Sequence, residues 1–374
     1  MVRSGRRSTG SAAAIAMAVI ALLSLGLLSV ALSGCSSAAH SAASSSGGST
    51  STGSGTASPR SPTATTSVTA RNAGGSGGCG SSVHVAVSSG NGLQNALSSA
   101  RPGETIVLAP GTYNGNFVVT QSGTQSAPIT LCGPRTAVLS GGDIGSGYVF
   151  HLEHASWWHL MDFTITGGQK GVMADDSDHD LLYGLYVHST GDEGIHLRDF
   201  SSHDTISHSL VRDTGLLVPF YGEGIYVGSA HSNWCQYSGC QPDASNDDII
   251  TGNNIADTTA ENIDIKEGTT GGQIIGNQLN GSGMAESAAT AWVNVKGNTW
   301  LIADNVGVDS VKDGFQDHKV YTGWGMYNTF RGNRADVNGP GYGFYVQSKH
   351  LDTTVACQNT VSNAASGFSS VACA

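Results

Sequence analysis

Short stretches of alternating apolar and polar residues recur through the second half of the chain. In 263–266, Ile263 and Ile265 alternate with Asp264 and Lys266. Successive side chains of a strand point to opposite faces, so the isoleucines would enter a core while Asp264 and Lys266 share the outer face. The same pattern returns at 192–198, 222–228, 291–296, 313–318 and 342–347. Intervals of mostly about 20–30 residues indicate a solenoid in which each coil contributes one such strand.

Stacking these strands in register places their outward side chains in columns, one residue per coil. The first column is Glu193, Glu223 and Glu261; the second is His196, Tyr226, Asp264, Asn294, Gln316 and Tyr345; the third is Arg198, Gly228, Lys266, Lys296, His318 and Gln347. A slip of one residue would turn each column inward, so the expected site depends on this register.

The N-terminus has the pattern of a targeting segment. Basic residues at positions 3, 6 and 7 precede an apolar run that ends at Leu32-Ser33-Gly34-Cys35. This order resembles a bacterial lipoprotein signal, which implies that residues 1–35 direct export and that a lipid on Cys35 anchors the protein at the outer face of the bacterial cell membrane. The alternative is a protein released extracellularly. An ordinary signal peptide or an uncleaved anchor would also place the domain outside the cytoplasm.

Composition divides the rest of the chain into a tether and one domain. Residues 36–78 are rich in Ser, Thr and Gly and almost free of large apolar side chains, which predicts a flexible tether. Residues 79–374 would form a single monomeric solenoid. The formal net charge of −11 argues against a nucleic-acid partner. A polyanionic substrate would need local lysines or a bridging cation.

Six cysteines follow Cys35, and an even number in an exported chain favours disulfides. Proximity in sequence favours the pairs Cys235–Cys240 and Cys357–Cys373, which leaves Cys79 for Cys132. The spacing fits no common zinc motif.

The start of the domain carries a resemblance to a known fold. A short amphipathic helix at 92–97 is followed by the strand and turn of 103–113, which contain Thr105-Ile106 and Ala109-Pro110-Gly111-Thr112-Tyr113. This opening resembles that of right-handed parallel β-helix proteins of the pectate-lyase type, with the helix capping the open core. Asparagines recur at the coil period and resemble the asparagine ladder of such folds: Asn253, Asn277, Asn305, Asn333 and Asn359. The resemblance implies an all-β parallel β-helix, which carries lyases, hydrolases, esterases, epimerases and adhesins alike.

A lyase that cleaves a uronate polysaccharide is the first functional expectation. β-Elimination needs a base for the proton next to the carboxylate and positive charge to neutralise that carboxylate. The spacing of Glu261 and Lys266 is similar to that in the chondroitinase B and alginate lyase family, which implies that Lys266 is the base and Glu261 a calcium ligand. The chain departs from the family at Thr259, where the family has a second glutamate, and Lys296 is the nearest substitute for an arginine on the next coil.

The expected roles follow from the columns and from this resemblance. Catalytic candidates are Lys266, Asp264, Arg198 and Lys296; substrate-binding candidates are Glu223, Tyr226, His196, Asn294, Gln316, His318 and Trp234; calcium candidates are Glu193, Glu223 and Glu261. Trp234 belongs to an insertion, 229–246, that the Cys235–Cys240 pair would close.

Two other functions remain open. A glycoside hydrolase would use two carboxylates, Asp264 with Glu223, Glu261 or Asp313. A non-catalytic glycan binder would use exposed tryptophans among Trp157, Trp158, Trp234, Trp292, Trp300 and Trp324. The acidic cluster at 175–180 is expected to be a solvated turn between coils, with calcium binding as the alternative.

Overall fold

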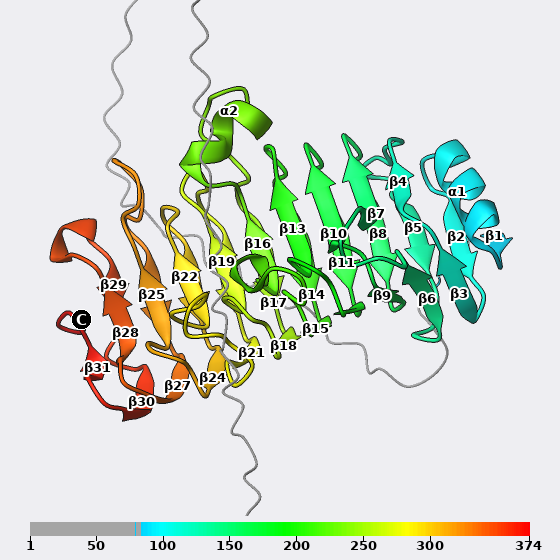
Figure 1. Cartoon of the computed structure of the whole chain (residues 1–374). Helices are drawn as coiled ribbons and strands as arrows, with labels where there is room; N and C mark the ends of the chain where they lie inside the picture. The colour runs from blue at the N-terminus through cyan, green and yellow to red at the C-terminus, as the bar shows by residue number, and fades with distance from the viewer. Residues whose placement is uncertain (1–78, 80–83) are drawn as a thin grey trace, which may run out of the picture. The chain divides into compact units, whose positions relative to one another are not determined.

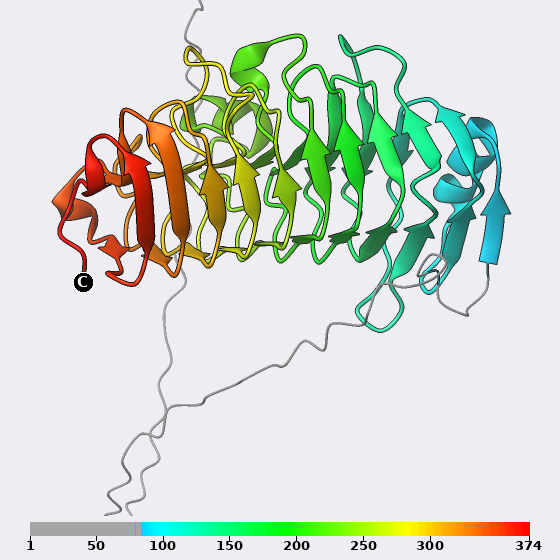
Figure 2. The ribbon, with the colours of Figure 1, turned by 90° about the horizontal axis from the view of Figure 1, so that it is seen from below.

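The computed structural model describes Cys79 and residues 84–374 as a parallel β-solenoid. Figures 1 and 2 show the strands following one another along the axis in chain order. The signal sequence, the lipid site Cys35 and the tether lie outside the described residues and stay predictions. None of the helices within the described part is long and apolar enough to cross a membrane. The predicted parallel β-helix is confirmed.

Three parallel sheets form the described solenoid, and each coil contributes one strand to each of them. The first sheet contains β1 (His84–Val87), β2 (Thr105–Leu108), β5 (Ile129–Cys132), β8 (Trp158–Met161), β11 (Leu181–Tyr183), β14 (Thr205–Ser207), β17 (Ile249–Thr251), β20 (Gln273–Ile275), β23 (Leu301–Ala303), β26 (Thr329–Arg331) and β29 (Thr354–Val355). The second contains β3 (Gly111–Asn114), β6 (Ala137–Ser140), β9 (Thr164–Thr166), β12 (Tyr186–His188), β15 (Leu210–Arg212), β18 (Asn254–Ile255), β21 (Gln278–Asn280), β24 (Val306–Val308), β27 (Arg334–Gly339) and β30 (Thr360–Ala364).

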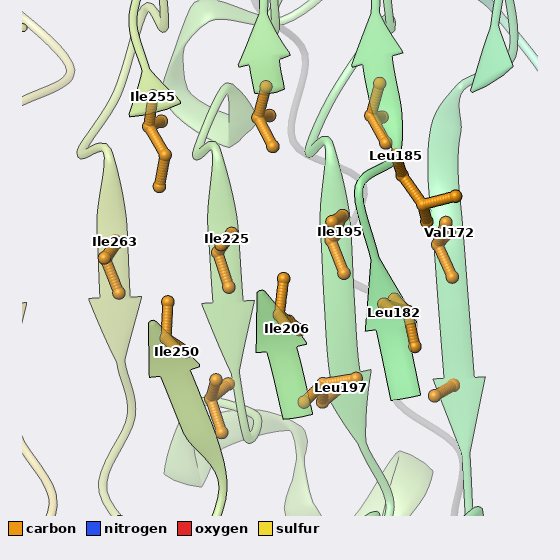
Figure 3. Close-up of a cluster of buried hydrophobic side chains, with 14 of the residues drawn as sticks. Val172, Leu182, Leu185, Ile195, Leu197, Ile206, Ile225, Ile250, Ile255 and Ile263 are labelled. Carbon is orange, nitrogen blue, oxygen red and sulfur yellow. The ribbon is translucent and has the colours of Figure 1, made fainter. Parts of the chain in front are cut away.

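The third sheet carries the outward columns predicted from the sequence. Its strands are β4 (Phe117–Val119), β7 (Tyr148–Glu153), β10 (Lys170–Asp175), β13 (Ile195–Arg198), β16 (Ile225–Val227), β19 (Ile263–Ile265), β22 (Val293–Val295), β25 (Phe315–Asp317), β28 (Tyr342–Val346) and β31 (Gly367–Ser369). Ile195, Ile225 and Ile263 pair in register and are fully buried, as Figure 3 shows. Each buried isoleucine stabilises the fold by about 1.5–3 kcal/mol relative to an exposed one.

A helix covers the N-terminal end of the core (Figure 1). It is α1 (Gly90–Ser99), whose N-cap Ser89 accepts a hydrogen bond from the backbone of Gly92. Its own Leu93 and Leu97 side chains are buried against the core, and Gln94 donates to the Val118 carbonyl of β4 at 3.0 Å. The capping role predicted from the sequence is confirmed.

The asparagine ladder is also present, in the turns that precede the second sheet. In a representative rung, the side-chain oxygen of Asn305 accepts from the backbone and side-chain nitrogens of Asn277, both at 2.9 Å. The Asn305 amide nitrogen donates to the Ile274 carbonyl and to Asn333. These bonds satisfy buried turn groups and fix one coil to the next.

A second ladder, made of aspartates, precedes the first sheet. The backbone nitrogen of Asp180 donates to Asp204 at 2.7 Å, and that of Asp204 donates to Asp248 at 2.9 Å. All three are buried, and the second carboxyl oxygen of each lacks a hydrogen-bond partner. Burial raises the pKa of each carboxyl well above 3.8. The expectation that 175–180 is a solvated turn is therefore wrong for Asp180, because this carboxyl faces the interior of the stacked turns.

All three predicted disulfides are formed: Cys79–Cys132, Cys235–Cys240 and Cys357–Cys373. The second closes the insertion, which contains η2 (His231–Asn233) and α2 (Trp234–Tyr237) and projects beyond the strand ends near β16 (Figure 1). Two other short helices are η1 (Pro219–Tyr221) and η3 (Lys349–Leu351).

The aspartate ladder predicts an unusual pH dependence of stability. The Asp204 carboxyl stays protonated in the folded state at pH values where it ionises in the unfolded state. Wild-type stability should therefore fall as pH rises above the ordinary pKa of 3.8. Asp204→Asn replaces the carboxyl by an amide that stays neutral. We expect its unfolding temperature, relative to wild type, to rise steadily as the pH is increased.

Thermal unfolding across a pH series measures this difference, with the exposed Asp352→Asn as the matched control. A constant difference between Asp204→Asn and wild type at every pH would show that Asp204 is not held protonated.

Candidate active site

The predicted register of the outer face is confirmed. Tyr226 pairs with His196 on one side and with Asp264 on the other, and Asp264 pairs with Asn294. These side chains therefore stand on neighbouring coils, separated by about 4.8 Å per coil. The second column therefore has the predicted order of residues, and it brings acidic, basic and aromatic groups to one surface.

A buried carboxylate between two lysines forms the centre of this surface. Asp264 is 2% exposed, and its two oxygens receive the ammonium groups of Lys266, at 2.7 Å, and of Lys296. Burial alone would raise the pKa of Asp264, but the two ammonium groups outweigh it and lower this pKa to about 2. Burial would lower the pKa of Lys266, yet Asp264 outweighs it and raises this pKa well above 10.5.

Two glutamates stand next to Asp264. Oxygen atoms of Glu223, Glu261 and Asp264 lie within 4.8 Å of one another, so these three carboxylates could hold a metal ion. Burial, followed by repulsion from Asp264, raises the pKa of both glutamates. Glu223 has one buried oxygen without a hydrogen-bond partner, whereas Glu261 accepts from the backbone nitrogen of Thr290 at 3.3 Å.

Glu193 does not join this group, contrary to the expectation that it would bind calcium with the other two glutamates. Its carboxylate pairs with Lys170 and lies 3.4 Å from the ring of His196. Asp264, which was expected to be catalytic, takes the third position of the triad. The difference arises because the glutamate column runs across several coils, and only the coils of Glu223 and Glu261 adjoin Asp264.

Tyr226 lies directly beside the ion pair of Asp264 and Lys266. The ammonium nitrogen of Lys266 is 4.7 Å from the centre of the Tyr226 ring, and the edge of this ring meets His196 at 4.3 Å between ring centres. Burial raises the pKa of the Tyr226 hydroxyl above 10.0 and lowers that of His196 below 6.5. Tyrosine therefore keeps its proton and histidine stays neutral near pH 7.

A cleft of about 650 Å³ opens above these residues. It is lined by side chains from β7 to β19 of the third sheet, by the loop that contains η1 and by the insertion. Lys266 and Tyr226 line it, together with Glu223 and His196. The site thus has the concave, polar form of a binding groove.

Arg198 lies in the same cleft but two coils away from Lys266. Its guanidinium donates twice to Asp175, at 2.6 and 3.2 Å, and the ring of Tyr237 stacks on it at 3.8 Å. The structure does not bring Arg198 into contact with the central lysines. Its position suits substrate binding better than proton transfer.

Two substrate-binding expectations are corrected by burial. Trp234 is 6% exposed and donates to the Ser229 carbonyl inside the insertion, so its ring is not offered to a sugar, and Tyr237 lines the cleft instead. Gln316 is fully buried and bonds to Thr290 and Asp313, which is a structural role.

Asn294 and His318 lie on the C-terminal side of the ion pair of Asp264 and Lys266. The side-chain oxygen of Asn294 lies 3.1 Å from the His318 ring nitrogen, and its amide nitrogen donates to Glu261 at 3.5 Å. Burial lowers the pKa of His318 to about 4. Asn294 is on the coil of Lys296 and His318 is on the next coil, so the polar surface continues towards the C-terminal coils.

The tryptophan-based glycan binder loses its main support. Trp158, Trp292 and Trp300 are buried in the core, and Trp157 stacks on His179 outside the cleft. The ionisable cluster is the feature that distinguishes this face.

Lys170 was missed from the sequence. It pairs with Tyr148 of β7 on the preceding coil, and it is aligned with Glu193 on the following coil. Extending the glutamate column one coil towards the N-terminus would have revealed it, but the Gly-Gly-Gln sequence before Lys170 lacks the acid of the other coils.

The chain is similar to proteins of known structure. No family model matches the chain, and no curated protein does. The crystal structure of an alginate lyase from Paenibacillus sp. strain FPU-7 aligns with a TM-score of 0.72 and 35% identity, covering 78% of this chain and 99% of that one.

Two further structures align with lower similarity. The pectate lyase Pel9A is 16% identical with a TM-score of 0.47, over 72% of each chain. A mannuronic acid specific polysaccharide family 6 lyase from human gut microbiota is 14% identical with a TM-score of 0.49, over 74% of this chain and 67% of that one.

The identity to the Paenibacillus enzyme extends over nearly all of that enzyme and over the described β-helix of this chain. The chain therefore belongs to the parallel β-helix polysaccharide lyase family that includes this alginate lyase.

Proposed function

We propose that this protein cleaves a uronate polysaccharide, with alginate as the first candidate, by β-elimination. The observation that carries the proposal is the close approach of Lys266 and Tyr226 in the cleft, 4.7 Å from nitrogen to ring centre, beside a second lysine on Asp264. An amine, a protonated phenol and an additional cation are the groups that this reaction needs. The relation to an alginate lyase supports the same substrate class.

In this mechanism, Lys266 takes the proton from C5 of the uronate unit. The electrons form the C4–C5 double bond while the bond from C4 to the glycosidic oxygen breaks. Tyr226 gives its proton to that oxygen, which becomes the hydroxyl of the new reducing end. The other product carries the unsaturated uronate. Lys266 then releases the C5 proton to solvent, and solvent returns the proton that Tyr226 has lost.

Lys296 has two roles in this proposal. Lys266 and Lys296 share Asp264, so Asp264 keeps one ammonium partner when Lys266 is uncharged. In this proposal, the same ammonium group also stabilises the carboxylate of the reacting uronate as negative charge develops. Because the ion pair with Asp264 raises the pKa of Lys266, the substrate must open this pair before the amine can act as a base.

A hydrolase is the second candidate, since Glu223, Glu261 and Asp264 lie within 4.8 Å of one another. A hydrolase needs one protonated and one ionised carboxyl group. The triad offers both, because burial favours protonated glutamates and the lysines keep Asp264 ionised. The adjacent lysines and tyrosine have no necessary part in this chemistry, so we place elimination first.

The carboxylate triad also fits a calcium ion. The carboxylates of Glu223, Glu261 and Asp264 match the oxygen ligands that calcium takes, and a bound ion would supply positive charge near the substrate. Calcium would compete with Lys266 and Lys296 for Asp264. We propose that the two lysines supply this charge.

Substitution of the proposed proton-transfer groups tests the mechanism. We expect Lys266→Ala and Tyr226→Phe each to lower kcat on alginate by about 10²–10⁴-fold, the usual contribution of a positioned acid or base. The absorbance of the unsaturated uronate gives the rate. Lys349→Ala, on an exposed lysine remote from the cleft, is the control. Wild-type rates in folded Lys266→Ala protein would refute the assignment.

The pH profile tests which partner of the pair loses its proton. The free amine is the active form of Lys266, and its pKa lies well above 10.5 in the ion pair. Burial keeps Tyr226 protonated over the same range. We therefore expect kcat/KM on alginate to rise from neutral into alkaline pH. A rate that falls through this range would mean that protonated Lys266 is the active form.

Removal of divalent cations tests calcium. Because two lysines already neutralise the centre, we expect chelator-treated protein to keep its rate within about twofold, a change too small to reflect a lost catalytic group. Glu261→Gln serves as the comparison. If chelation abolished activity and added calcium restored it in wild type but not in Glu261→Gln, the triad would be a functional metal centre.

A further inference from the structure

The cleft continues beyond Lys266 towards the N-terminal coils. Lys266 comes from the coil of β19, whereas Lys170 comes from the coil of β10 and Tyr148 from that of β7. The coils of Lys170 and Lys266 are three strand spacings apart, or about 14 Å at about 4.8 Å per spacing. One sugar unit is comparable in length to one spacing. A polysaccharide that reacts at Lys266 would therefore reach Lys170 about three units away.

Basic side chains are concentrated in this cleft, although the whole chain has a formal charge of −11. Of the twelve lysines and arginines in 84–374, Lys170, Arg198 and Lys266 line it. An ammonium group has three hydrogen-bond donors, and Lys170 pairs with Glu193. It retains donors for a second carboxylate. The side chain of Lys170 is 12% exposed, so its ammonium group remains accessible from the cleft.

Exposed aromatic rings also line this cleft. Phe220 and Tyr221 are 59% and 57% exposed, and both line the cleft. Exposed rings of this kind mark binding surfaces, and a ring offers a flat apolar face with little conformational entropy to lose.

The backbone beneath these rings is fixed before any ligand arrives. Leu217 and Val218 donate to the Gly191 carbonyl at 2.8 and 3.2 Å, and the hydroxyl of Thr259 donates to the Pro219 carbonyl at 2.9 Å. This loop is therefore attached to two coils of the solenoid, which makes it a preorganised platform.

We propose that Lys170 forms a distal subsite for one uronate unit of the polymer, in the cleft that the Phe220–Tyr221 platform also lines. The Lys170 ammonium group binds the uronate carboxylate, and the aromatic platform covers an apolar face of the chain. This subsite lies about three units from the bond that is cleaved. Its position is counted from Lys266, so it rests on the proposed function. The protein then favours oligomers long enough to occupy both ends of the cleft.

Rates on uronate oligomers of increasing length test the subsite in the full chain. Lys170→Met removes a charge-assisted hydrogen bond of about 1.5–3 kcal/mol, so we expect kcat/KM to fall by about tenfold or more on long oligomers. Lys170→Met should match wild type on oligomers too short to reach Lys170. Tyr221→Ala is the comparison: its loop is attached to the coil of Lys266 through Thr259, so we expect kcat/KM to fall at every length.

The controls are Lys349→Met, an exposed lysine in η3, and Tyr183→Ala, in β11 on the first sheet. Neither lines the cleft, so neither should change the dependence on length. An equal loss at every length in Lys170→Met would overturn the proposal. So would no loss at any length.

A binding measurement separates failure of the subsite from failure of the proposed function. Calorimetry with uronate oligomers uses Lys266→Ala protein with and without Lys170→Met. If wild type produces no unsaturated product but binding still requires Lys170, the subsite stands and the elimination mechanism is wrong. If wild type eliminates while Lys170→Met changes neither length dependence nor affinity, the subsite is wrong and the mechanism stands.

Discussion

In-register stacking of the coils is the constraint on which the site depends. Isoleucines on one face of each strand stack in the core, and the Asn253–Asn359 ladder connects the turns through side-chain amides. A one-residue slip would place Asp264 and Lys266 inside the solenoid. Because the register holds, a residue and its counterpart one coil later are neighbours, and three separate segments of chain supply Tyr226, Asp264 and Lys296 to one point.

Pairing with basic side chains allows the ionised carboxylates on this face to be buried. Isolated ions are expensive to bury, and three acids in the cleft region have basic partners. Asp175 has Arg198, Glu193 has Lys170, and Asp264 has two lysines. Glu223 and Glu261 have no such direct partner, and burial raises their pKa. The result is a set of groups held in different protonation states within a few ångströms, which is what proton transfer requires.

The sequence predicted the architecture well because it is periodic. Alternation in 263–266, repeated at the coil interval, was enough to predict both the columns and the approach of Lys266 to Asp264. Burial off the periodic strands was harder to predict. Trp234 folds into its own insertion, and Asp180 turns inward at a corner, because the path of a loop is not encoded in strand alternation. Lys170 escaped notice since its coil replaces an acid by a base in an otherwise acidic column.

Cleavage of alginate in water enriched in heavy oxygen tests the central claim most directly. Elimination breaks the bond from C4 to the glycosidic oxygen without adding water, so mass spectrometry should show unlabelled products immediately after cleavage, half of the new ends being unsaturated. Hydrolysis would insert labelled oxygen and leave both new ends saturated. Saturated, labelled products would contradict the account and move the chemistry from Lys266 and Tyr226 to the carboxylates of Glu223, Glu261 and Asp264.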